Sequence, residues 1–222
     1  MNGNRWAHAG IGTQTAALAA TGYHSSIINT SEEYNGTSWT SGNNVSTNRY
    51  YLAAAGTQSA GLIMGGNTGS LSNVTEEYDG TNWSAGGNMS TPQQTSGGFG
   101  IQTAAVSTGH HTSSHQTTTE EYNGSAWSAG GALNTSRSYL MAAGKLTTGL
   151  CFGGYTSSTS SVTEEYDGTS WSSAKDLLVS MAFAGGFGAQ SAAVQMGGWK
   201  SPSAYTTSQE YDKPQMQWSS AS

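Results

Sequence analysis

The chain has 222 residues, of which 35% are hydrophobic and 9% are charged, and its formal net charge is −6. Its seven Lys and Arg residues are scattered, so the chain lacks the clustered basic face that binding to nucleic acid requires. No apolar run approaches the roughly 18 residues of a membrane span, so membrane insertion is not expected. The N-terminal residues lack the charged-then-apolar pattern of a secretory leader, so we expect either a mature chain or one that is not secreted by that route.

One motif recurs along the chain at a fixed spacing. It has the form Glu-Glu-Tyr-(Asn/Asp)-Gly-x-x-Trp, and its tyrosines stand 44 residues apart at Tyr34, Tyr78, Tyr122 and Tyr166. A divergent fifth copy contains Tyr211 and Trp218. A fixed period of this size is the signature of a repeat protein. It predicts five units, which span residues 1–44, 45–88, 89–132, 133–176 and 177–222.

Each unit is expected to contain four β-strands. In the second unit these strands cover residues 49–56, 60–64 and 74–78, and the fourth begins at Trp83. No segment has helical periodicity of useful length. A four-stranded sheet of this size cannot bury both of its faces alone, whereas radial stacking of copies buries them. The sequence therefore predicts a single all-β domain over residues 1–222, a five-bladed β-propeller with four antiparallel strands in each blade.

The repeat register also predicts how the two ends of the chain are used. Residues 4–6 align with residues 48–50, at the start of a first strand, and the last residues fall in a fourth strand. Every blade is then one uninterrupted segment. The propeller is expected to close by packing of the first blade on the fifth, without exchange of strands between them.

Tryptophan and glutamate occupy fixed places in the repeat. The tryptophans are candidates for sugar-stacking platforms, but one per blade favours wedges between blades. Paired glutamates suggest acid–base chemistry or a cation site. Adjacent strand residues point to opposite faces, however, so Glu76 and Glu77 form no carboxylate pair. Their repetition favours structural hydrogen bonds between blades, and no catalytic residue, metal or cofactor is expected.

Cysteine and histidine give no recognised site. Cys151 is the only cysteine, and its apolar neighbours favour a core residue over a nucleophile. A transition-metal site at His110, His111 and His115 lacks the Cys or carboxylate neighbour that would complete a known ligand spacing. Solvated loop histidines are therefore expected at His24, His110, His111 and His115.

One position varies while the scaffold around it stays constant. The residue after the Gly pair that ends each second strand is Tyr23, Asn67, His111, Tyr155 or Trp199. In an antiparallel pair the end of the second strand lies beside the start of the first, where Arg5, Arg49 and Arg137 stand. Rings with Arg and polar loop groups suit a glycan or a polar peptide. These eight residues are the candidate ligand-binding set; the alternative is a solvated collar of loops.

These landmarks together resemble the kelch repeat. The Gly pair is intact at Gly65–Gly66, Gly153–Gly154 and Gly197–Gly198, a Tyr and then a Trp five residues later follow it, and an Arg often opens the next first strand. The amino-acid sequence of the motif also resembles kelch-like arrays in tailed-phage and environmental viral sequences.

The resemblance implies a function as well as a fold. Kelch-like propellers include binding platforms, structural parts and a few oxidases. For this chain the resemblance implies a non-catalytic recognition or adhesion module, in a viral tail fibre or surface appendage at the virion surface, that contacts a cell-surface glycan. The alternative is a purely structural propeller with no ligand. An enzyme is not expected.

Overall fold

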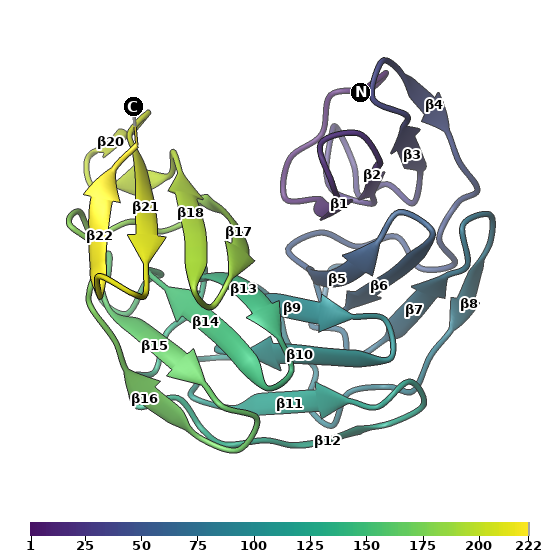
Figure 1. The fold of residues 1–222 in the computed structure, drawn as a ribbon. Helices are drawn as coiled ribbons and strands as arrows, with labels where there is room; N and C mark the ends of the chain where they lie inside the picture. Colours follow the sequence, from purple (N-terminus) through teal and green to yellow (C-terminus); the bar gives the residue numbers. More distant parts are fainter. Residues whose placement is uncertain (222) are drawn as a thin grey trace. The chain divides into compact units, whose positions relative to one another are not determined.

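The computed structural model describes residues 1–221, which form strands, turns and loops without a helix. The strands make five sheets of four antiparallel strands each, and these are the blades of the predicted five-bladed β-propeller (Figure 1). A further two-stranded hairpin lies within the fifth blade. Residues 1–221 therefore contain no helix with the length and hydropathy needed to cross a membrane.

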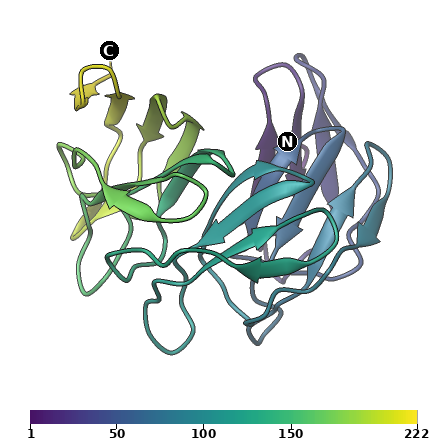
Figure 2. The same ribbon diagram turned by 60° about the horizontal axis from the view of Figure 1, so that its bottom comes forward.

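The strands of each blade follow one another in chain order and lie side by side, which Figure 2 shows from a second direction. The first blade comprises β1 (Ala9–Gly12), β2 (Ala17–Ala20), β3 (Ser31–Tyr34) and β4 (Trp39–Ser41). The second comprises β5 (Ala53–Thr57), β6 (Ala60–Met64), β7 (Thr75–Tyr78) and β8 (Trp83–Ala85). The third comprises β9 (Gly97–Ile101), β10 (Ala104–Thr108), β11 (Thr119–Tyr122) and β12 (Trp127–Ala129). The fourth comprises β13 (Met141–Lys145), β14 (Thr148–Phe152), β15 (Thr163–Tyr166) and β16 (Trp171–Ser173). The fifth comprises β17 (Gly185–Ala189), β18 (Ala192–Met196), β21 (Ser208–Asp212) and β22 (Gln217–Ser220), with the hairpin β19 (Trp199–Lys200) and β20 (Ser203–Ala204) inserted between β18 and β21.

Residue contacts divide the chain into two compact units. The first unit comprises residues 1–95, 101–105 and 122–128, and the second comprises the other described residues. A single domain over residues 1–222 stays a prediction. Among the described residues, no blade sheet combines strands from the two ends of the chain, which agrees with the expected absence of strand exchange.

The first strand of each blade begins later than the sequence predicts. In the second blade it starts at Ala53 rather than at residue 49. The cause is Tyr51, whose φ of +56° is a left-handed conformation that interrupts a strand. The preceding residue, Tyr50, makes only an isolated bridge to Asn67. The left-handed residue recurs in every blade, as Ala7, Tyr51, Thr95, Tyr139 and Phe183.

Neighbouring blades are joined by a hydrogen bond from a tyrosine to a glutamate. The donor is the Tyr of a third strand, and the acceptor is the second Glu of the motif in the preceding blade. The four bonds join Tyr78 to Glu33, Tyr122 to Glu77, Tyr166 to Glu121 and Tyr211 to Glu165. The Tyr122 bond measures 2.5 Å and the Tyr211 bond 2.9 Å. The predicted structural hydrogen bonding between blades is thus confirmed for these glutamates.

Two of the tryptophans that follow these tyrosines, Trp127 and Trp171, also contact the preceding blade. The rings of Tyr166 and Trp171 stack with centroids 4.8 Å apart. The indole Nε1 of Trp171 donates to Oγ1 of Thr119 at 3.0 Å, and that of Trp127 donates to Oγ1 of Thr75 at 2.9 Å. The prediction that these tryptophans are wedges between blades is confirmed for Trp127 and Trp171.

A buried arginine ties the strands of its own blade together. The guanidinium of Arg137 donates to the carbonyl oxygens of Gly153 and Val162 at 2.9 and 2.5 Å, and to Oε1 of Glu164 at 2.9 Å. Arg49 makes the same set of bonds in the second blade, and Arg5 makes it in the first. Each arginine therefore bonds its own Glu and the backbone at the ends of the second and third strands.

The fifth blade replaces this ion pair by a neutral set. Met181 stands at the place of the arginine and Gln209 at the place of the glutamate. The amide Nε2 of Gln209 donates to Oε1 of Gln195 at 2.8 Å and to the carbonyl oxygen of Val179 at 3.1 Å. Because both charges are replaced together, no buried charge is left without a partner at this place.

Cys151 belongs to the core, as the sequence predicts. Its side chain is buried among Phe99, Val106 and Leu140. Burial raises the pKa of the Cys151 thiol to about 12, so the thiol is protonated near neutral pH and is a poor nucleophile.

We expect the buried Arg137 to make a large contribution to the stability of the fourth blade. Arg137→Met alone should lower the free energy of unfolding by about 3–5 kcal/mol, because it leaves the Glu164 carboxylate buried without its cation. The double variant Arg137→Met, Glu164→Gln, which removes both buried charges together, should recover part of that loss. Urea unfolding measures both, with the exposed Lys145→Met in the same blade as the control. A double variant no more stable than Arg137→Met would contradict this account.

The bond between Tyr166 and Glu121 should contribute to stability in a manner that depends on pH. Tyr166→Phe should lower the free energy of unfolding by about 1.5–3 kcal/mol at pH 7, since a hydrogen bond to a charged group is lost. Burial and this bond raise the pKa of Tyr166 to about 12 from an ordinary value near 10, so its contribution is complete below pH 10 and is lost as the pH rises toward 12. Urea unfolding between pH 7 and 12 should show the difference between wild type and variant shrinking above pH 10. Tyr205→Phe, at an exposed tyrosine, is the control; a difference that stays constant to pH 12 would refute the assignment.

Candidate recognition site

The candidate site is built from the loop that follows the second strand of a blade. In the fourth blade Tyr155 bridges Ser138 on one side and Thr159 on the other, so its backbone is fixed from both directions. The Gly pair before it is required by geometry. Gly154 has a φ of +102°, and a Cβ there would lie 2.8 Å from the carbonyl oxygen of Ser138. The sequence predicts that the end of the second strand lies beside the start of the first strand. The bridge between Tyr155 and Ser138 confirms this in the fourth blade.

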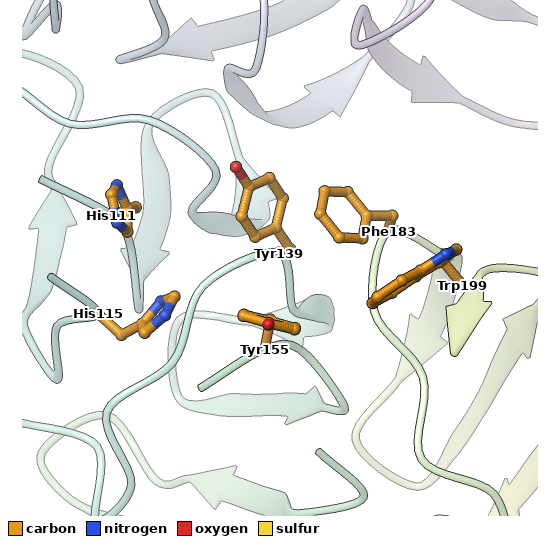
Figure 3. A pocket seen from close by; sticks show the side chains of 6 residues that line it. All are labelled: His111, His115, Tyr139, Tyr155, Phe183 and Trp199. Carbon is orange, nitrogen blue, oxygen red and sulfur yellow. The ribbon is translucent and has the colours of Figure 1, made fainter. Parts of the chain in front are cut away.

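Six rings surround an open hollow of about 660 Å³ in the second unit. They belong to His111, His115, Tyr139, Tyr155, Phe183 and Trp199 (Figure 3). The volume lies within the range of small-molecule sites, about 300–1,000 Å³. The two histidines lie at one end of the hollow and Trp199 at the other, with the tyrosines and Phe183 between them.

The rings also contact one another. Tyr139 and Phe183 have centroids 3.9 Å apart, and Phe183 meets Trp199 edge to face at 6.2 Å. The ring centroid of Tyr155 lies 6.3 Å from that of Trp199 and 5.6 Å from that of His115. The lining therefore combines flat apolar faces with polar ring edges, namely two imidazoles, two phenolic hydroxyls and an indole N–H.

The structure brings together three of the five predicted ring-position residues. His111, Tyr155 and Trp199 line the same hollow. Tyr23 belongs to the first unit, where its ring packs against Trp6 and Tyr50 at 5.0 and 5.6 Å. Asn67 also belongs to that unit, and its side chain bonds Gly69 and Gln94.

The predicted position of the arginines beside these rings is corrected. The side chains of Arg49 and Arg137 are 0% exposed, and that of Arg5 is 3% exposed. Their guanidinium groups point into the blade toward Glu76, Glu164 and Glu32, since those carboxylates and the nearby carbonyl oxygens satisfy them. Sequence position placed the arginines at the correct end of the strand but did not reveal that they point inward.

The prediction of solvated loop histidines is wrong for His110, whose side chain is only 2% exposed. Burial, with a smaller contribution from the charge of His111, lowers the pKa of His110 to about 4. At the rim of the hollow, burial also lowers the pKa of His115, and its Nδ1 lies 2.9 Å from Oγ of Ser138. Both imidazoles are therefore neutral near pH 7.

Two lining residues were not among the predicted set. Tyr139 and Phe183 stand at one repeat position, and both adopt left-handed backbone, with φ of +53° and +55°. Such a conformation is uncommon for aromatic residues and is concentrated at functional sites. The repeat register offered a signal, because this position varies between blades just as the ring position does. The left-handed backbone, which turns these rings toward the hollow, has no signature in the sequence.

The lining has no features of a metal centre. In residues 1–221 no group of three or more His, Cys, Asp or Glu side chains is arranged to hold a metal ion. The two histidines of the hollow have ring centroids 5.2 Å apart, and no carboxylate lines the hollow with them.

Comparisons with known proteins give no family for this chain. No protein-family model matches it, and no curated protein matches it significantly. The resemblance to kelch repeats therefore rests on the residues of the motif alone.

We expect the buried imidazole of His110 to oppose folding at acid pH. Its folded pKa of about 4 lies below the ordinary value of 6.5, so the unfolded chain binds the proton more readily and stability falls as the pH drops from 6.5 toward 4. His110→Gln should remove that part of the loss, measured by urea unfolding at pH 7 and 4.5. His24→Gln, at an exposed histidine, should leave the pH dependence unchanged. If the two variants behave alike, the neutral buried imidazole is not the cause.

Proposed function

We propose that the protein is a non-catalytic recognition module that binds a glycan in the hollow of the second unit. The observation that carries the proposal is the six-ring lining around about 660 Å³ of open space. The five-bladed scaffold is compatible with a binding module, and three of the five variable ring-position residues line this hollow.

The chemistry of the lining suits a saccharide. Sugars present apolar C–H faces that stack on aromatic rings, and hydroxyl edges that exchange hydrogen bonds with polar groups. Tyr155 and Trp199 offer faces, while His111, His115 and Tyr139 offer polar edges. The rings are held by left-handed backbone and by isolated bridges. A site fixed in this way loses little conformational entropy when a ligand binds.

A binding role is preferred to a hydrolytic one on the basis of the lining residues. Glycoside hydrolysis uses a pair of carboxylic acids on either side of the scissile bond. The side chains that line the hollow supply rings and no carboxylate. The glutamates of the repeat are engaged elsewhere, in bonds within and between blades.

The resemblance of the motif to kelch-like arrays in phage sequences suggests where such a module would act. It favours a part of a viral tail fibre or surface appendage, in which the blades form the support and the hollow contacts a glycan on the host cell. The alternative is a structural propeller without a ligand, and the same experiment separates the two.

A glycan array probed with the full chain tests the proposal. Binding to a defined group of glycans is expected, and Trp199→Ala and Tyr155→Ala should each weaken it roughly tenfold or more, because each removes a ring that contributes to a binding hot spot. Trp6→Ala, which removes an exposed tryptophan of the first unit, should bind as the wild type does. Melting curves confirm that the variants fold. Absence of binding to any glycan would favour the structural propeller, and unchanged binding by Trp199→Ala would place the site elsewhere.

A further inference from the structure

A second, smaller hollow adjoins the ring-lined one. It encloses about 310 Å³ and is lined by Tyr155, Ser157, Ser158, Thr159, Trp199, Lys200 and Ser201. Tyr155 and Trp199 line both hollows, so these two rings form the shared wall between them. A ligand longer than one ring would therefore pass from the first hollow into the second over these two side chains.

The two hollows differ in chemistry. The larger is lined by six rings, whereas the smaller adds hydroxyl groups and one ammonium group to the shared pair. The hydroxyls come from the short loop after Tyr155 and from Ser201 of the hairpin, and Oγ1 of Thr159 lies 3.1 Å from Oγ of Ser180. Serine and threonine hydroxyls both donate and accept hydrogen bonds, so they suit any saccharide unit. The ammonium group of Lys200 is selective, because it attracts an anion.

Lys200 lies in the loop that follows the ring position, and in the fifth blade this loop forms a two-stranded hairpin. Lys200 lies on β19 of this hairpin, where it pairs with Ser203 of β20, and the preceding Trp199 bridges Ala182. In the first four blades the same loop closes with one isolated bridge, as between Tyr155 and Thr159, so the hairpin is a longer form of a loop that all the blades share. This loop therefore contributes both Trp199 and Lys200 to the lining of the smaller hollow.

Lys200 also differs from most cations of the chain in its partners. Four of the seven Lys and Arg residues are engaged in ion pairs with glutamates, namely Arg5, Arg49, Arg137 and Lys213. Within residues 1–221, no other Lys or Arg lines either hollow, and no carboxylate does. The net charge of −6 repels an anion at long range. Salt screens that repulsion beyond about 8 Å at physiological ionic strength, so the local ammonium group decides the preference.

We infer that the ligand is an acidic saccharide, with a sugar ring in the larger hollow and an anionic substituent of the neighbouring unit against Lys200. The inference rests on the proposed glycan-binding function and names its substrate class. A carboxylate and a sulfate share the required chemistry, since both present several acceptor oxygens to the Nζ protons.

Pairs of glycans that differ by one carboxylate or one sulfate test the inference. The full chain should bind the acidic member of a pair roughly two- to fivefold more tightly than the neutral member, as expected for one partly exposed ion pair. The preference should decrease as sodium chloride rises from 50 to 300 mM. Separate carboxylate and sulfate pairs identify which anion is preferred.

Lys200→Gln is the decisive variant, because the glutamine keeps the polar side chain and removes the charge. It should bind acidic and neutral glycans equally, with affinity for the neutral member within twofold of the wild type. The matched control Lys175→Gln removes a lysine that lines neither hollow and should keep the preference. Equal binding of both members by the wild type, or a preference that survives in Lys200→Gln, overturns this inference and leaves glycan binding standing. Failure to bind any glycan overturns the proposed function itself.

Discussion

Two adjacent glutamates in the third strand point to opposite faces of their sheet, and the framework depends on this alternation. In the second blade Glu76 bonds Arg49 of its own blade, while Glu77 accepts a hydrogen bond from the hydroxyl of Tyr122 in the next blade. One dipeptide thus holds its own strands together and also holds a neighbour. Because the motif repeats, the same two bonds recur wherever both partners are present, and the aromatic wedge packs beside them. Polar contacts at fixed places supply part of the specificity of the fold. The fold therefore needs few apolar residues, and only 35% of the chain is hydrophobic.

The framework leaves two repeat positions free to vary, and the candidate site uses both. One follows the Gly pair and provides His111, Tyr155 and Trp199; the other is the left-handed residue and provides Tyr139 and Phe183. At the left-handed position the bonds between blades run through the backbone, as from the N–H of Phe183 to the carbonyl oxygen of Tyr139 at 3.3 Å, and do not depend on the identity of the side chain. Substitution of a side chain at either position changes the surface of the hollow without removing a Tyr–Glu bond between blades or an Arg–Glu pair within a blade. Constant contacts and variable rings are therefore separated in the sequence as well as in space.

Much of the fold was predictable because it depends on period and alternation. The 44-residue step of the tyrosines fixed five blades, and the opposite faces of Glu76 and Glu77 followed from strand geometry. The site was harder to predict. The direction of the Arg137 side chain depends on the buried Glu164 carboxylate, and the register alone does not show whether an arginine at a strand end points inward or outward. The late start of the first strand and the turn of Tyr139 toward the hollow both depend on a left-handed residue. No composition rule predicts that conformation for a tyrosine.

The central claim is that a rigid framework presents a ring-lined recognition surface in the second unit. The indole N–H signals of the seven tryptophans offer the most direct test, because one NMR spectrum reports on the framework and on the site together. Titration with the glycan that binds best on the array should shift the signal of Trp199 and leave those of Trp127 and Trp171, the wedges between blades, in place. A shift of Trp127 or Trp171 with Trp199 unmoved would contradict the account, since the ligand would then contact the framework and not the rings.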